Sequence, residues 1–233
     1  EYIATQPIQR PADVDSSKGW WLTGLEYGNK DLWRQENLEK VKTPVMAYTK
    51  DSKLIAEGDI QIKAQAEQDI TSRVYSISVA VAGGSGFAVG LSGAGAQAEN
   101  LIAADIGAYI DGDGATGTEP GVQAADIDIQ AKDISSVDAK VEACSVAVSF
   151  AGGSAGFSVS LGVSLAYNQI SNLVHSAIID SRVKAADMNL SAQDISQIKA
   201  KSMAIALSFG IGSSLGVGAA GAGGVAQNKI DNQ

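Results

Sequence analysis

The sequence predicts an all-β protein, built as an elongated β-solenoid-like stack of three repeats of about 60–68 residues with an N-terminal cap. Three observations carry this prediction: recurring short patterns, strands that alternate with period two, and a scarcity of large side chains. Hydrophobic residues make up 45% of the 233 residues, but aromatic residues only 6%. A core of small residues suits closely stacked strands better than a thick globular interior.

The repeat is marked by alternating segments that begin with Asp and by an asparagine that closes each unit. The alternating segments are residues 59–64, 126–131 and 187–192, and the closing residues are Asn100, Asn168 and Asn228. An Asp-Ile pair follows each alternating segment, at Asp69, Asp133 and Asp194. An Asp/Gly-rich insertion at residues 112–120 lengthens the second unit. Self-similarity at a fixed period is typical of solenoid proteins.

These landmarks divide the chain into four parts. Repeat 1 is assigned to residues 45–107, repeat 2 to 108–176, with alanines 108 and 177 aligned at their starts, and repeat 3 to 177–233. Residues 1–44 are assigned to a cap or to the degenerate end of a preceding repeat, since solenoid ends and sheet edges need covering. The tryptophans at 20, 21 and 33 distinguish this segment, and an aromatic binding platform is the alternative.

Each repeat also contains a long uncharged segment, such as residues 143–174 and 202–228. In these segments large apolar residues alternate with Ser, Ala and Gly, and glycine clusters separate the alternating runs, which predicts β-hairpins. We expect the large-residue face to pack on the body of the unit. We expect the small-residue face to let another sheet or unit approach closely, or to form a lateral surface between chains.

The uncharged segments are long enough to cross a bilayer. However, they are rich in Ser and Gly, alternate with period two and lack basic flanks. Membrane insertion is therefore not expected.

Charge and chemistry exclude several functions. The net charge is −9, from 17 basic and 26 acidic residues, so nucleic acid is not an expected partner. The chain has one histidine, His175, and one cysteine, Cys144, and shows no nucleotide-binding or zinc motif. We predict that it is not an enzyme. A carbohydrate-active β-helix enzyme is the rival on architecture, but no cluster of carboxylates supports it.

One ligand site is predicted, in the insertion of the second unit. Asp111, Asp113 and Glu119 could supply hard oxygen ligands to Ca²⁺, with Gly112 and Gly114 permitting a tight turn. The alternative is an ordinary Asp/Gly-rich loop. No other cofactor is expected.

The order Ala-Tyr-Ile-Asp, Asp-Ile-x-Ile-x-Ala, a Val/Ala/Ser run, Gly-Gly and a closing Ala-x-Asn resembles giant β-strand-repeat exoproteins of Gram-negative bacteria, of the leukotoxin-type and filamentous-haemagglutinin-like kinds. The resemblance covers residues 45–233. It implies a β-solenoid, export, and roles in adhesion, matrix formation or toxicity, and it carries over no active-site residue.

Together these observations predict a structural or adhesive module of a secreted, extracellular or cell-surface protein that self-assembles into filaments. Its expected partners are neighbouring repeats or chains, and a host or matrix glycan or protein. A toxin or membrane-active segment is the alternative from another functional class.

Overall fold

The computed structural model describes residues 42–233, so the cap predicted for residues 1–44 lies outside the described residues except at its last three positions. The described chain makes three turns of a solenoid, here called rungs. The first rung contains β1 (Thr43–Lys50), β2 (Leu54–Ile55), β3 (Ile60–Gly84) and β4 (Phe87–Ile102). The second contains β5 (Ala104–Asp111), β6 (Val122–Gln123), β7 (Asp126–Ala151) and β8 (Ala155–Ile170). The third contains β9 (Leu173–Ile179), β10 (Val183–Lys184), β11 (Asp187–Gly212) and β12 (Leu215–Ile230).

Corresponding strands of the three rungs pair in parallel and form four three-stranded sheets. The sequence prediction of an all-β, solenoid-like stack is therefore confirmed. The rungs are in register at their closing residues, because Asn100 pairs with Asn168, and Asn168 with Asn228. Lys50 pairs with Asp111 but Leu54 pairs with Val122, so the second rung holds seven extra residues at this corner.

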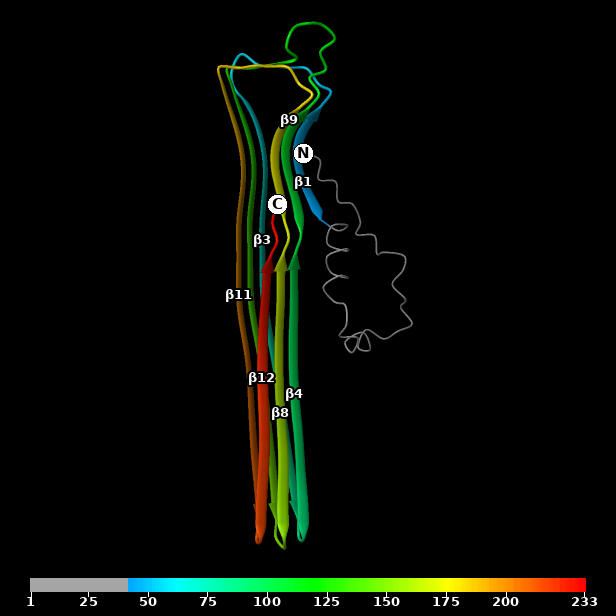
Figure 1. Ribbon diagram of the computed structural model, residues 1–233, viewed down its shortest axis with the longest axis vertical. Coiled ribbons are helices and arrows are strands. Elements are labelled where there is room, and N and C mark those ends of the chain that lie inside the picture. Colours follow the sequence, from blue (N-terminus) through cyan, green and yellow to red (C-terminus); the bar gives the residue numbers. More distant parts are fainter. Residues whose placement is uncertain (1–41) are drawn as a thin grey trace, which may run out of the picture. The chain divides into compact units, whose positions relative to one another are not determined.

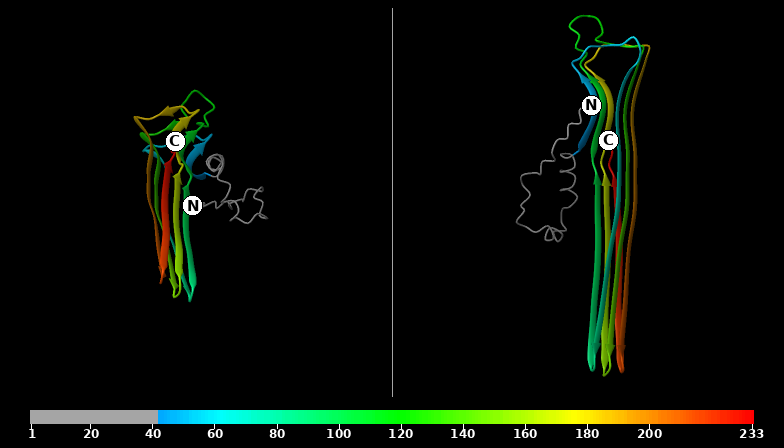
Figure 2. Two further views of the ribbon diagram at one scale, coloured as in Figure 1. Left: turned by 60° about the horizontal axis from the view of Figure 1, so that its bottom comes forward. Right: turned by 180° about the vertical axis from the view of Figure 1, so that it is seen from behind.

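Each rung is a long, flat arch of two layers (Figure 1). One layer is the sheet β3-β7-β11, whose strands are 25 or 26 residues long. The other consists of the 16-residue strands β4, β8 and β12, continued by the short strands β1, β5 and β9. Figure 2 shows the two layers running side by side along the long axis of this part of the chain.

The uncharged segments form arches rather than the predicted hairpins. In a hairpin the two strands hydrogen-bond to each other, whereas β3 and β4 pair with β7 and β8 of the next rung. The turn after β3 therefore brings β4 opposite β3 across the interior, so that the two strands meet through their side chains.

The interior between the layers is lined by small side chains, which contradicts the expected packing of the large-residue face. In β7 the inward positions include Ala139, Ala143, Ser145 and Ala147, all at most 2% exposed. The backbones approach so closely that a Cβ added to Gly90 would lie 2.8 Å from the carbonyl oxygen of Val148. Only Gly, Ala and Ser fit such a gap, so the large side chains of the same strands must point outward.

The outer faces near the turns are consequently apolar. Ile77 is 77% exposed on β3, Leu161 is 57% exposed on β8, and Phe209 is 54% exposed on β11. Farther from the turns the outer face of the β3-β7-β11 sheet is polar and charged, while the interior there is filled by larger residues such as Ile127 and Ile129.

A residue with positive φ turns the chain at the same corner of every rung. These residues are Asp51 (φ 45°), Gly112 (φ 77°) and Asp180 (φ 47°). Glycine adopts this conformation without strain, and Asp is one of the few other residues that tolerate it. The corner precedes the seven-residue insertion, which leaves the stack as a loop in the second rung alone (Figure 1).

Candidate functional site

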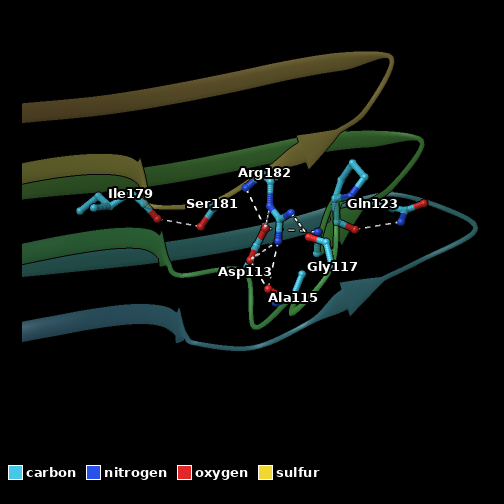
Figure 3. A network of polar contacts seen from close by, with 9 residues as sticks. Asp113, Ala115, Gly117, Gln123, Ile179, Ser181 and Arg182 are labelled. Atoms are coloured by element: carbon cyan, nitrogen blue, oxygen red, sulfur yellow. Dashed lines mark hydrogen bonds and ion pairs between the residues drawn. The ribbon is translucent and has the colours of Figure 1, made fainter.

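The predicted calcium ligand Asp113 is held by an arginine of the third rung (Figure 3). The Arg182 side chain donates to the Asp113 carboxylate from Nε at 2.9 Å, and the Arg182 backbone N–H donates at 3.0 Å. Backbone N–H groups of Ala115 and Gly121 donate to the same carboxylate. The Arg182 guanidinium also donates to the carbonyl oxygens of Ala115 and Gly117.

This ion pair keeps Asp113 negatively charged. The hydrogen bond from the Arg182 side chain, followed by those from the backbone N–H groups, holds the pKa of the Asp113 carboxyl well below its usual range. The loop is thereby fastened to the neighbouring rung, and we call the Asp113–Arg182 pair the loop clasp. Sequence reasoning missed Arg182, although its place two residues after the corner Asp180 puts it directly beside the insertion in a stack.

The other two predicted ligands do not join Asp113. Asp111 lies 3.7 Å from Lys50 of the first rung, and Glu119 is exposed on the loop. Within residues 42–233, no group of three or more His, Cys, Asp or Glu is placed to hold a metal ion. Asp113 thus anchors the loop to the third rung, and the calcium site stays a prediction.

The closing asparagines form a hydrogen-bonded ladder through all three rungs. Asn100 Nδ2 donates to Asn168 Oδ1 at 2.7 Å, and Asn168 Nδ2 donates to Asn228 Oδ1 at 2.8 Å. Both bonds point the same way. The ladder therefore offers an acceptor oxygen, on Asn100, at the first rung and a donor, on Asn228, at the third.

A second buried network joins the layers of the second rung. Asn172 Nδ2 donates to Asp133 Oδ2 at 2.7 Å and to Ser135 Oγ at 3.1 Å, and the Ser135 hydroxyl donates to Asp133 at 2.6 Å. Asp133 pairs in register with Asp194 of the third rung. Asp133 Oδ1 and Asp194 Oδ2 are buried and accept no hydrogen bond from the described residues. Burial, and then the charge of Asp194, raise the pKa of the Asp133 carboxyl, while its bonds to Ser135 and Asn172 oppose the shift.

We expect Asp133→Asn to stabilise the protein at pH 7 by about 1 kcal/mol, because the amide keeps an acceptor and removes a buried charge. A carboxyl whose pKa is raised on folding contributes stability that is fully present below its unfolded pKa, near ~4, and is lost as the pH rises through the folded pKa. The variant should lose this part of the pH dependence.

Chemical denaturation between pH 4 and pH 7, followed by circular dichroism, measures both effects. Asp138→Asn is the matched control, since Asp138 lies exposed on the outer face of the same strand. Equal pH profiles for Asp133→Asn and the parent protein would contradict the raised pKa.

The single histidine belongs to a column of rings on the outer face. The Tyr48 and Tyr109 rings stack with centroids 5.1 Å apart, and His175 stacks on Tyr109 at 5.8 Å. His175 Nδ1 lies 3.5 Å from the Asp105 carboxylate. The three rings therefore form a column on the surface that runs in the direction in which the rungs stack.

The chain matches nothing in the comparisons with known proteins. No protein-family model matches it, and no curated protein or solved structure does so. Within residues 42–233 there is no helix of the length and hydrophobicity needed to cross a membrane.

Proposed function

We propose that this chain is a structural and adhesive module of a secreted or surface-displayed repeat protein, and that it assembles end to end into filaments by adding rungs. The observation that carries the proposal is the asparagine ladder, which presents complementary groups at its two ends. An Asn228 side chain can donate to Asn100 of a second copy as Asn168 donates to Asn228 within the chain.

The sheet edges support the same assembly. Among the described residues, β3 and β4 of the first rung pair along one edge alone, with β7 and β8 of the second rung. The third-rung strands β11 and β12 also pair along one edge alone, with the opposite edges of β7 and β8. Unpaired N–H and C=O groups on such long edges are a template for another chain. Because the rungs pair in parallel and in register, a further rung can be added with the hydrogen bonding already present between rungs two and three.

Export and adhesion complete the proposal. They are supported by the repeat pattern and by the acidic composition, with a net charge of −9 that keeps a long stack soluble. Host or matrix molecules are the proposed adhesive partners.

We expect Asn228→Asp to weaken assembly without disturbing the fold. The carboxylate keeps the oxygen that accepts from Asn168 but loses the Nδ2 donor and places a charge against the next copy. A lost or unsatisfied hydrogen bond of about 1–3 kcal/mol raises the concentration needed for assembly by about fivefold to a hundredfold.

Light scattering and electron microscopy of the purified chain over a concentration series measure this. Gln193→Glu is the matched control, because it makes the same amide-to-acid change on the outer face of β11, at the register level of Lys132 and Gln65. The control should assemble like the parent protein. If the parent protein stays monomeric at high concentration, or if both variants assemble equally well, assembly through this edge is wrong.

A further inference from the structure

The apolar outer surface near the turns has a definite extent. The apolar band, as we call it, consists of the outward-facing residues of 77–95, 144–163 and 205–223, which contain no charged residue. It covers both outer faces of the arch, since it includes Ile77 and Phe209 on one layer and Leu161 on the other. A partner protein usually covers one face of a sheet, whereas a hydrocarbon environment covers both.

The interior behind the band contains hydroxyl groups that hydrogen-bond to one another, although the buried Ser149 Oγ has no partner among the described residues. A chain of hydroxyl groups crosses it: Ser92 donates to Ser78 at 3.0 Å, Ser145 to Ser92 at 2.9 Å, and Ser160 to Ser145 at 2.8 Å. Small polar groups inside and large apolar groups outside reverse the arrangement of a sheet that faces water. The serines of these strands, which argued against membrane insertion in the sequence, are thus turned away from the surroundings, whereas Gly93 and Gly95 lie on the outer face.

The depth of the band matches a bilayer. Residues 77–84 of β3 and 87–95 of β4 span about 26–30 Å at about 3.3 Å per residue, and the hydrocarbon core of a bilayer is about 30 Å thick. The turns at the tip are short and uncharged, such as Ser85 and Gly86 in the first rung.

A basic row limits the band on the β3-β7-β11 sheet. Arg73, Lys140 and Lys201 are register partners on the outer face, so three positive charges lie at one level on adjacent strands. Like charges directly opposite one another destabilise a sheet in water. At this level Lys140 pairs with Glu142 at 2.9 Å and lies 5.4 Å from the centre of the Tyr75 ring. Basic and aromatic side chains at the end of an apolar segment suit the phosphate and interfacial region of an anionic bilayer.

We propose that the apolar band inserts into the hydrocarbon core of an anionic lipid bilayer, with the row Arg73, Lys140 and Lys201 at the level of the lipid phosphates. The inference rests on the proposed end-to-end assembly, because unpaired strand edges are not tolerated in hydrocarbon and must be covered by further rungs.

The native Cys144 provides the reporter, since it lies at the start of the band on the outer face of β7 and is partly exposed. The full chain is labelled there with an environment-sensitive fluorophore and mixed with vesicles of phosphatidylglycerol and phosphatidylcholine. We expect a blue shift, a several-fold gain in intensity and protection from iodide quenching. The matched control carries the label at Ser136→Cys in a Cys144→Ser background, eight residues away on the same strand and face, and should stay accessible to iodide.

Variants test the band itself. Ile77→Lys with Leu161→Lys places charge within the band at exposed positions, where the fold tolerates it, and should reduce vesicle binding about tenfold or more. Thr71→Lys with Leu101→Lys adds the same charge at exposed positions outside the band, opposite Asp138 and Gln169, and should not reduce binding.

The outcomes separate this inference from the proposed function. Filaments without any vesicle-dependent shift would overturn membrane insertion and leave the assembly standing, whereas loss of both filaments and shift would overturn both. Equal shifts at positions 144 and 136 would contradict the proposed depth. A shift that grows with protein concentration in the absence of vesicles would show that a second copy covers the band, and would also overturn the inference.

Discussion

Gly90→Ala is expected to destabilise the protein by about 1–3 kcal/mol, although it adds a single methyl group. The added Cβ would lie 2.8 Å from the carbonyl oxygen of Val148 and 3.3 Å from its carbon. These are backbone atoms of the facing layer, so no side chain can move aside and the layers themselves must separate. Because the layers are in contact along β3 and β4, separation at one point strains the neighbouring contacts of Ala and Ser.

Gly93→Ala is the control, in the same strand and with the same change. Gly93 points outward, and nothing lies within 4 Å of the position that its added methyl group would take. The substitution should be neutral or stabilising by up to about 1 kcal/mol, because Ala restricts the unfolded chain. Chemical denaturation followed by far-ultraviolet circular dichroism gives both values. Similar effects of the two variants would mean that the layers are not closely packed.

Asn168→Ala should cost about 2–3 kcal/mol, because it breaks the ladder at its central member. Asn168 is 3% exposed and Asn100 is 8% exposed, so the Asn100 Nδ2 group would be left buried without its acceptor. The variant also removes the donor to Asn228 and leaves a small void between the layers.

Asn228→Ala provides the comparison for this prediction. It removes one bond of the same kind, but at the exposed third rung, where water can replace the lost group. Its cost should be at most about 1 kcal/mol. Thermal and urea unfolding of the two variants measures the difference, and equal losses would show that the ladder contributes little to stability.

The fold class and the repeat were predictable because both follow from periodicity. Asp126 and Asp187 mark equivalent positions, as expected, and so do the closing asparagines. Aligning the repeats by short patterns failed for the Asp-Ile pair, which does not occupy the same register position in every rung. Asp69 pairs with Ser136, three residues beyond Asp133. At the start of the repeats Ala177 pairs with Tyr109, so the predicted alignment with Ala108 is wrong by one residue.

Which face of each strand points into the interior was not predictable from the alternation of large and small residues. Period two separates the large residues from the small ones but does not say which set lies inside. The usual preference for burying large apolar residues indicated the wrong face, because the distance between the layers, set by backbone contacts such as that at Gly90, admits only small side chains. The Asp113–Arg182 pair was missed for a related reason, since it joins residues of different rungs and becomes visible only in the stacked register.

The loop at residues 112–121 occurs in one rung of the three, and its clasp ties it to the rung that follows. In a filament of stacked copies, rungs about 4.8 Å apart would place successive loops about 14 Å from each other along one side. The exposed residues Thr116 and Glu119 would then recur at this interval as a regular linear array. Weak individual contacts through such an array add up to strong attachment when a partner has sites at the same spacing.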